Sequence, residues 1–304
     1  MWKPLKDFLR KIMPESMFNF LQPYYARLKM RKRLITAYFR SKQHLPPVRK
    51  YDKIIIGFHV VEHCNLNCAS CDNFSAIAEK EFIDPERFRK DMEHLGRMFN
   101  HECERISLLG GEPLLHPELV KFIETARENF SSGYIEIITN GILLTQQHQE
   151  FWQACHDNQV TISVTHYPIS IDIAKIRELA EKYDVELKLS DMTKSTFYKR
   201  AVDITGSGDT WKNFVQCIRN DCITLGHDGH LFTCTFASNI HHFNKKFGFN
   251  IPITEDDYID IYKEDDPQKI LRRLSEPIPM CRFCDLNYKP FRWHQSKQEL
   301  SEWV

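Results

Sequence analysis

Three cysteines, Cys64, Cys68 and Cys71, lie close together in one short segment of the chain. Cysteine thiolates are the usual ligands of iron–sulfur clusters, which normally take four protein ligands. No fourth cysteine occurs before Cys103, so the C-x3-C-x2-C set can hold three irons of a 4Fe–4S cluster and leave the fourth iron open. The spacing therefore predicts a cluster whose open iron binds a small molecule and is the place where the chemistry occurs.

Zinc is the alternative metal for this triplet, because three close thiolates also suit that ion. A structural zinc site takes four tetrahedral ligands, and His63 or His94 could supply the fourth. The motifs that follow along the chain favour iron and sulfur over zinc.

A glycine pair follows at the end of a predicted strand. The apolar run 106–109 leads into Gly110, Gly111 and Glu112. A strand that opens directly into paired glycines lets the backbone approach a ligand closely. The segment therefore predicts a tight strand tip that carries a carboxylate.

These motifs resemble the radical S-adenosylmethionine (SAM) superfamily. The resemblance is carried by residues 58–71, by the Gly-Gly-Glu segment, and by two later predicted strands at 134–139 and 160–165. In that family SAM chelates the open iron, and an electron from the cluster cleaves SAM to a 5′-deoxyadenosyl radical. The resemblance implies that the cofactor-binding residues are Gly110, Gly111, Glu112, Asn140 and Ser163. The Glu112 carboxylate would accept hydrogen bonds from the SAM amino group.

One position departs from the family pattern. The residue before the third cysteine is commonly aromatic and packs near the adenine, whereas this chain has Ser70. That change puts the local adenine contact in doubt, although the nearby Phe74 could substitute for it. The spacing of the cluster ligands is intact.

The fold class predicted is α/β. Asp84 and Pro85 are typical of a helix N-terminus, and further helices are expected from Pro117 and near Ile173. Strands that alternate with helices imply a parallel sheet. The resemblance implies an incomplete, TIM-like (β/α)6 barrel in residues 51–205, with its active groups at the carboxyl ends of the strands. Residues 206–304 are predicted to form a small appended subdomain.

Five more cysteines lie in the last third of the chain, at Cys217, Cys222, Cys234, Cys281 and Cys284. The run from Cys217 through Gly229 to Cys234, followed later by Cys281 and Cys284, resembles the auxiliary-cluster subdomain called twitch, a shortened form of the SPASM domain. That resemblance implies a second 4Fe–4S cluster, with Cys217, Cys234, Cys281 and Cys284 as its ligands.

The sequence leaves two candidates, Cys217 and Cys222, for the first cysteine ligand of the auxiliary cluster. Asp228 and Gly229 predict a hairpin turn, and pairing about that turn places residue 222 or 223 opposite Cys234. The family spacing favours Cys217. Zinc is again the alternative metal. The histidines that could join such a zinc site are His227, His230, His241 and His242.

The composition limits the class of protein. A chain of 304 residues with 42% hydrophobic residues can form one barrel-sized domain and a small appendage. Ten cysteines without a signal peptide predict metal chemistry in a reducing cytoplasm rather than a disulfide framework. No apolar run approaches the ~20 residues of a membrane span.

Positive charge is concentrated at the start of the chain. Residues 1–50 hold 13 Lys and Arg against two Asp and Glu, a net charge of +11. Apolar residues recur there at helical spacing, which predicts a basic amphipathic helical extension. Two roles stay open: peripheral contact with a membrane or another anionic partner, or packing on the chain's own barrel. The basic residues match no recognised nucleic-acid motif, so no nucleic-acid partner is expected.

The resemblance implies an enzyme that cleaves SAM reductively and abstracts a hydrogen atom from a small polar substrate, with flavodoxin or ferredoxin as electron donor. Twitch-bearing relatives act on sugar alcohols or on a nucleotide. Oxidation or epimerisation of a sugar or glycan precursor, lipid-linked or phosphorylated, is therefore the leading hypothesis. One alternative is radical modification of a ribosomally made peptide, although residues 1–50 are too short for the docking domain of such enzymes. A zinc-stabilised binding module is the other alternative, and it would leave the Gly-Gly-Glu segment without a role.

Overall fold

The computed structural model describes residues 17, 28, 35 and 39 and residues 51–190, 193–217 and 222–304. The chain divides into two compact units, Met1–Pro46 and Pro47–Val304. Apart from those four isolated residues, which are helical, the predicted basic extension 1–50 lies outside the described residues. Within the described ranges no helix is both long enough and apolar enough to cross a membrane.

The second unit is built on an eight-stranded sheet with the order β5-β4-β3-β2-β1-β7-β8-β9. Its strands are β1 (Ile55–Val61), β2 (Arg105–Gly110), β3 (Tyr134–Thr139), β4 (Val160–Val164), β5 (Leu187–Leu189), β7 (Thr224–Leu225), β8 (His230–Phe232) and β9 (Tyr258–Asp260). Strands β1 to β5 are parallel, and β7 pairs in parallel with the other side of β1. The predicted α/β architecture with a parallel sheet is confirmed. Among the described strands the sheet is open, with β5 at one edge and β9 at the other.

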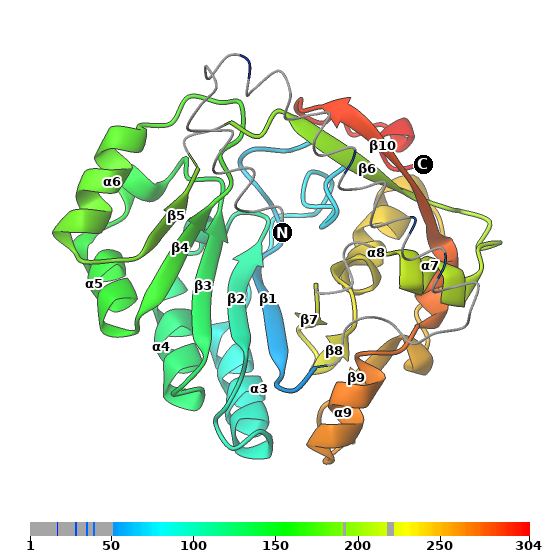
Figure 1. Ribbon diagram of the computed structural model, residues 1–304, viewed down its shortest axis with the longest axis horizontal. Coiled ribbons are helices and arrows are strands. Elements are labelled where there is room, and N and C mark those ends of the chain that lie inside the picture. Colours follow the sequence, from blue (N-terminus) through cyan, green and yellow to red (C-terminus); the bar gives the residue numbers. More distant parts are fainter. Residues whose placement is uncertain are drawn as a thin grey trace. The chain divides into compact units, whose positions relative to one another are not determined.

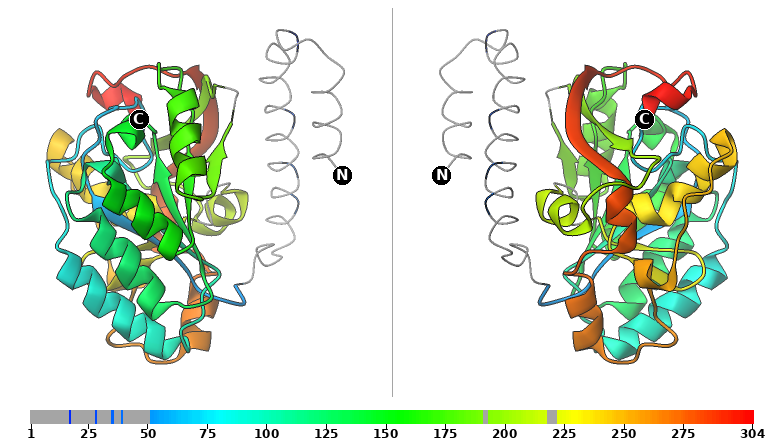
Figure 2. Two further views of the ribbon diagram at one scale, coloured as in Figure 1. Left: turned by 90° about the vertical axis from the view of Figure 1, so that its left-hand side faces the viewer. Right: turned by 90° about the vertical axis from the view of Figure 1, so that its right-hand side faces the viewer.

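Four helices connect the parallel strands and lie along the outer face of the sheet (Figure 1), as the side views also show (Figure 2). They are α3 (Pro85–Met98), α4 (Leu119–Asn129), α5 (Gln149–Asp157) and α6 (Ile173–Lys182). The ring of Phe58 in β1 packs 4.5 Å from that of Phe88 in α3 and 6.1 Å from that of Phe122 in α4, measured between centroids. Helix packing therefore occupies the outer face and leaves the inner face for the site.

Local sequence signals explain where these helices begin. The Asp84 carboxylate accepts a hydrogen bond from the Glu86 amide, and Pro85 occupies the first turn of α3, as predicted. Asp172 caps α6 in the same way. Helix α5 begins without a side-chain cap, and no helix was expected there from the sequence.

The strand after β5 does not join the parallel sheet, which differs from the expected barrel. Strand β6 (Thr196–Val202) pairs antiparallel with β10 (Cys284–Arg292) in a separate two-stranded sheet. The sixth parallel strand is instead β7, which lies next to β1. The predicted hairpin about Asp228 and Gly229 is confirmed, because β7 and β8 pair antiparallel and Gly229 has φ +78°.

The predicted segments 51–205 and 206–304 lie within one compact unit. Strands β7 to β9 extend the sheet that β1 begins. The remaining α-helices among the described residues of this unit are α7 (Thr210–Gln216), α8 (Thr235–Phe247) and α9 (Pro267–Arg273). A second apolar cluster joins the loop after β1 to α8 and to the C-terminus through Phe74, Phe243 and Trp303. The C-terminal elements thus share a core with the segment that carries the first cysteine motif.

Candidate active site

The three cysteines of the first motif lie in the loop beyond the carboxyl end of β1. All three are free thiols, and Cys68 and Cys71 line a cavity on the inner face of the sheet. The pKa of each thiol is raised to about 11, by burial above all, with a further increase from the charge of a neighbouring cysteine. Three thiolates can therefore coexist here only beside compensating positive charge, which the irons of a cluster would supply.

N–H groups from separate parts of the chain donate hydrogen bonds to these sulfurs. The Leu66 amide lies 3.3 Å from Cys64 Sγ, and the Trp293 indole nitrogen lies 3.1 Å from Cys68 Sγ. Hydrogen bonds to sulfur are among the factors that set a cluster's reduction potential. Trp293 follows β10, far from the motif in sequence, and no local pattern indicated its role.

Hydrogen bonds to the C-terminal segment fix the cysteine loop in place. The Ser70 hydroxyl donates to the Glu302 carbonyl at 2.6 Å, and the Trp303 indole N–H donates to the Cys71 carbonyl at 3.2 Å. Ser70 has φ +53°, a conformation that persists only where surrounding contacts impose it. The loop geometry therefore depends on residues more than 200 positions away.

The structure does not favour Phe74 as a replacement for the missing aromatic residue beside the adenine. Its ring is fully buried and packs 5.1 Å from the Phe236 ring and 5.9 Å from the Phe243 ring. The apolar cluster between the loop and α8 therefore takes this side chain away from the cavity.

The paired glycines lie directly against the cysteine loop. The Gly111 amide donates to the Val61 carbonyl at 2.8 Å, and the Glu112 amide donates to the His63 carbonyl at 3.2 Å. A Cβ atom on Gly111 would lie 1.9 Å from the His63 carbonyl oxygen, and one on Gly110 would lie 2.2 Å from the Val61 carbonyl oxygen. Only glycine allows the tip of β2 to approach the loop this closely.

The Glu112 side chain connects the tip of β2 to the tip of β3. Its carboxylate accepts hydrogen bonds from the Thr139 hydroxyl at 2.6 Å, the Asn140 amide at 2.9 Å and the Leu114 amide at 3.2 Å. Burial raises its pKa to about 7, although these three hydrogen bonds oppose the shift. Since a carboxylate has about four acceptor positions, about one is left for a ligand, and the role of Glu112 toward SAM stays a prediction.

Asn140 and Ser163 differ in their distance from the cysteines. The Asn140 side-chain amide donates to the Asn65 side chain at 2.8 Å, within 3.9 Å of Cys64 Sγ. Ser163, by contrast, donates its hydroxyl hydrogen to the Glu136 carboxylate at 2.8 Å. Asn140 is therefore joined to the cysteine loop, whereas Ser163 contributes to a polar layer on the strands. Cofactor contact by either residue remains a prediction.

The four predicted auxiliary cysteines line one cavity. Cys217 lies at the end of α7, and Cys234 lies at the start of α8. Cys281 lies shortly before β10, and Cys284 is the first residue of that strand. Burial raises the pKa of the Cys281 and Cys284 thiols, and nearby cysteines raise it further. The Asn213 side chain donates to the carbonyls of both residues at 2.9 Å. The donor set is soft sulfur in an enclosed setting, which fits an iron–sulfur cluster.

Cys222 lies elsewhere, on the cavity that Cys68 and Cys71 line. Within the ranges that the structure describes, no three His, Cys, Asp or Glu side chains converge closely enough to hold a single metal ion. The thiolates of a 4Fe–4S cluster bind separate irons, so their sulfurs are expected to lie further apart than the ligands of one ion.

Arg200 on β6 lies beside the auxiliary cysteines and contacts the residue that follows Cys71. It lines the auxiliary cavity, its side chain is 1% exposed, and its Nε atom lies 3.7 Å from the Asp72 carboxylate, one residue after Cys71. Its Nη1 atom lies 4.0 Å from Cys234 Sγ. Neither Nε nor Nη2 has a hydrogen-bond partner. Buried donors of this kind are normally satisfied, so the cavity fits an acceptor such as cluster sulfur.

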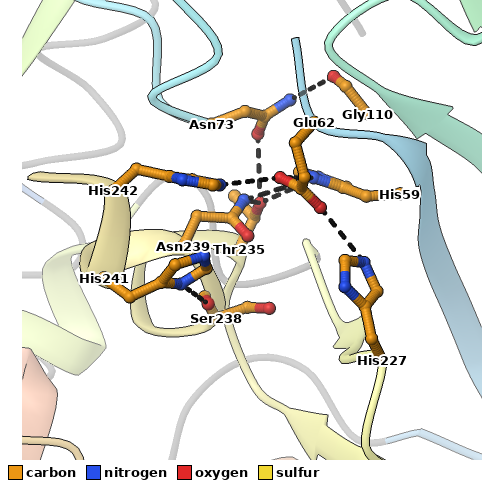
Figure 3. A network of polar contacts seen from close by, with 10 residues as sticks. All are labelled: His59, Glu62, Asn73, Gly110, His227, Thr235, Ser238, Asn239, His241 and His242. Atoms are coloured by element: carbon orange, nitrogen blue, oxygen red, sulfur yellow. Dashed lines mark hydrogen bonds and ion pairs between the residues drawn. The ribbon is translucent and has the colours of Figure 1, made fainter. Parts of the chain in front are cut away.

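A second polar cluster surrounds Glu62, between β1 and the C-terminal elements (Figure 3). The buried carboxylate contacts His242 Nε2 at 2.8 Å, His227 Nε2 at 3.1 Å and His59 Nδ1 at 3.5 Å. Burial alone would raise the pKa of Glu62, but the charge of His59 and the hydrogen bonds from the histidines hold it well below its ordinary value. His227 and His242, candidate zinc ligands from the sequence, thus contact this carboxylate.

The cluster reaches the first site through hydrogen bonds. Asn239 contacts the His59 ring at 3.5 Å and donates to the Thr235 hydroxyl at 3.1 Å. That hydroxyl donates to Asn73 at 3.0 Å, and Asn73 donates to the Gly110 carbonyl at 3.1 Å (Figure 3). The glycine tip is therefore tied to α8 as well as to the cysteine loop.

We expect Gly111→Ala to remove most of the iron from the first site. The added Cβ meets a backbone carbonyl, so the segment that carries Cys64 must move. Iron per chain after anaerobic reconstitution measures the effect. Gly248→Ala is the control, because nothing lies within 4 Å of a Cβ there and its cost is only the roughly 1 kcal/mol of a left-handed position. Equal iron in both variants would contradict the prediction.

Glu62→Gln should lower the free energy of unfolding of the cluster-free protein at neutral pH by about 3 kcal/mol, because the histidines lose a buried charge partner. The folded-state pKa of Glu62 is depressed, so its contribution is present above its ordinary value of 4.5 and lost as the pH falls through the folded value. Chemical denaturation across acidic pH should show a smaller acid-induced loss in the variant. His241→Gln, which alters the exposed neighbour of His242, should behave like the unsubstituted protein.

A family model described as the radical SAM superfamily matches residues 59–189. Among curated proteins, the chain is 29% identical over 103 residues to GTP 3′,8-cyclase of Staphylococcus carnosus, a match covering 31% of this chain and 29% of that protein. It is 30% identical over 92 residues to the S-adenosylmethionine-dependent nucleotide dehydratase of Lacinutrix mariniflava, covering 30% of this chain and 19% of that protein. The chain thus spans less than a third of the length of these relatives.

Solved structures similar to the chain include BtrN in complex with AdoMet and 2-DOIA, with TM-score 0.46, 20% identity, and coverage of 79% of this chain and 95% of that one. A histidine-tagged form of anSMEcpe with bound AdoMet gives TM-score 0.44 and 14% identity, and covers 75% of this chain and 79% of that one.

Proposed function

Residues 59–189 form a radical SAM domain, and from this premise we propose that the chain uses SAM to abstract a hydrogen atom from a small polar substrate. When bound, a 4Fe–4S cluster supplies the electron that cleaves SAM to a 5′-deoxyadenosyl radical. Cys64, Cys68 and Cys71 would hold that cluster. The observation that carries the proposal is that the cysteine loop, the glycine tip of β2 and the tip of β3 are joined by hydrogen bonds at one edge of the sheet.

In this proposal the residues at each strand tip have a separate role. Gly110 and Gly111 hold the tip of β2 against the cysteine loop, where their backbone would border bound SAM. Glu112 keeps the tip of β3 in place and offers its remaining acceptor position to the SAM amine, while Asn140 orients the loop near Cys64. Ser163 remains a proposed contact at the end of the cofactor.

A hydroxyl-bearing substrate, such as a sugar or glycan precursor, suits the inner cavity. Its lining includes Asp72, Ser107, Tyr167, Lys194 and Tyr198. These side chains can donate and accept hydrogen bonds, and Lys194 would suit a phosphorylated group. The curated relatives are described as acting on nucleotides, which are also phosphorylated and hydroxyl-bearing.

We also propose a second 4Fe–4S cluster at Cys217, Cys234, Cys281 and Cys284, which would accept an electron or anchor the substrate. Their shared cavity supports it, as do the two nitrogens of Arg200 that lack a hydrogen-bond partner. The partners proposed are a low-potential electron donor such as flavodoxin or ferredoxin and, for residues 1–50, a membrane surface.

Replacing Cys64, Cys68 and Cys71 together with alanine should abolish 5′-deoxyadenosine formation and lower iron by about four per chain, because the open iron is lost. Mass spectrometry after anaerobic incubation with SAM and dithionite gives the first value, and iron analysis the second. Cys103→Ala, which changes a buried cysteine outside both sets, serves as control. Undiminished 5′-deoxyadenosine in the triple variant would refute the radical SAM assignment.

Replacing Cys281 and Cys284 with alanine should also lower iron by about four per chain, yet leave substrate-independent SAM cleavage intact, because the two ligand sets lie on separate elements. Cys222→Ala should keep all of its iron, since Cys222 lies on the other cavity. Loss of iron in Cys222→Ala together with full retention in Cys217→Ala would reverse the ligand assignment. Zinc in the anaerobically purified protein would end the proposal of a second cluster.

A further inference from the structure

We propose that Arg200 is the positioning residue that sets the reduction potential of the auxiliary cluster. This inference rests on the proposed second cluster and assigns a role that the cysteine ligands do not fill. The observation behind it is a buried guanidinium with two nitrogens, Nε and Nη2, that lack a hydrogen-bond partner, in a residue that lines the cavity of the four auxiliary cysteines.

The surroundings of Arg200 fix the guanidinium in place. Its planar group lies over the Phe236 ring, 4.3 Å from the centroid, and an arginine stacked on an aromatic ring retains little freedom to turn. A guanidinium stays protonated in proteins, and the Asp72 carboxylate lies 3.7 Å from the Nε atom of Arg200. The side chain therefore carries a permanent positive charge at a defined place.

The hydrogen bonds of this cation are incomplete. A guanidinium has five N–H donors, yet the contacts found are a weak one to Cys234 Sγ at 4.0 Å and an ion pair with Asp72 at 3.7 Å. Leaving charged donors buried and unpaired is costly. The inorganic sulfides and cysteine sulfurs of a cluster are acceptors that would satisfy these donors.

The charge of the cluster determines in which direction Arg200 shifts its reduction potential. Adding one electron to a cluster makes it more negative by one charge and takes up no proton. A fixed cation beside it stabilises the reduced form more than the oxidised form, and hydrogen bonds to sulfur act in the same sense. Arg200 therefore raises the reduction potential of the auxiliary cluster, as an electron acceptor requires. Asp72 opposes this effect, because it compensates part of the charge on Arg200.

The test is a redox titration of the full chain, reconstituted anaerobically with iron and sulfide and followed by electron paramagnetic resonance. The Cys281→Ala, Cys284→Ala double variant identifies which signal belongs to the auxiliary cluster. Arg200→Met should decrease the equilibrium constant for one-electron reduction of that cluster at least tenfold, which corresponds to a potential about 59 mV lower. The first cluster should change much less. Arg200→Lys, which keeps the charge but loses the planar fork, should show a smaller decrease.

Two further variants separate this role from a merely structural one. Asp72→Asn should shift the auxiliary potential upward, opposite to Arg200→Met, because the positive charge of Arg200 is then less compensated. Arg282→Gln removes a positive charge next to Cys281 in sequence, but Arg282 is exposed and donates to the Gly206 carbonyl, so the potential should not change.

The outcomes distinguish this inference from the proposed function. Two clusters with an auxiliary potential unchanged in Arg200→Met and Arg200→Lys would overturn the role of Arg200 and leave the second cluster standing. A parent protein that holds only one cluster, or zinc at the second site, would overturn the auxiliary cluster and this inference with it. Loss of auxiliary iron in both Arg200 variants, with the first cluster and the fold retained, would support direct contact between Arg200 and the cluster.

Discussion

The contact between the tip of β2 and the cysteine loop is the constraint on which the site depends. At Gly110 and Gly111 the two backbones approach so closely that no side chain could stand between them. The amides of Gly111 and Glu112 complete this contact by donating to carbonyls of the loop. Because Glu112 in turn holds the tip of β3, one steric requirement positions three neighbouring strand ends. The beginning of the cysteine loop is thus placed by backbone contacts, and side chains such as Ser70 and Trp303 hold the rest of the loop.

Electrostatics imposes the second constraint. Seven thiols in two groups lie partly buried within one compact unit, and burial makes each group costly to ionise without nearby positive charge. Arg200, which lies between Asp72 and Cys234, supplies part of the compensating positive charge. The irons of the proposed clusters would supply the rest. An enclosed set of thiols with a fixed cation is more consistent with a redox centre than with a solvated surface motif.

The two cysteine sets are also mechanically connected. Trp293 donates to Cys68 Sγ, and Trp303 donates to the Cys71 carbonyl, so the segment after β10 closes the first loop. Strand β10 itself begins at Cys284. One short stretch of chain thus joins the two cysteine sets. A separate chain of contacts runs from Glu62 through Thr235 and Asn73 to Gly110 (Figure 3).

Sequence alone determined the features that rest on short-range patterns: the spacing of Cys64, Cys68 and Cys71, the cap of α3 at Asp84, and the hairpin at Gly229. Each depends on residues within a few positions of one another, where helical periodicity, capping and turn conformation act directly. The tertiary structure decided that Cys217 rather than Cys222 shares a cavity with Cys234, that β6 leaves the parallel sheet to pair with β10, and that Phe74 is buried. The roles of Arg200 and Trp293 likewise depend on contacts between strands and helices that are distant in sequence. Short-range sequence patterns do not predict such contacts.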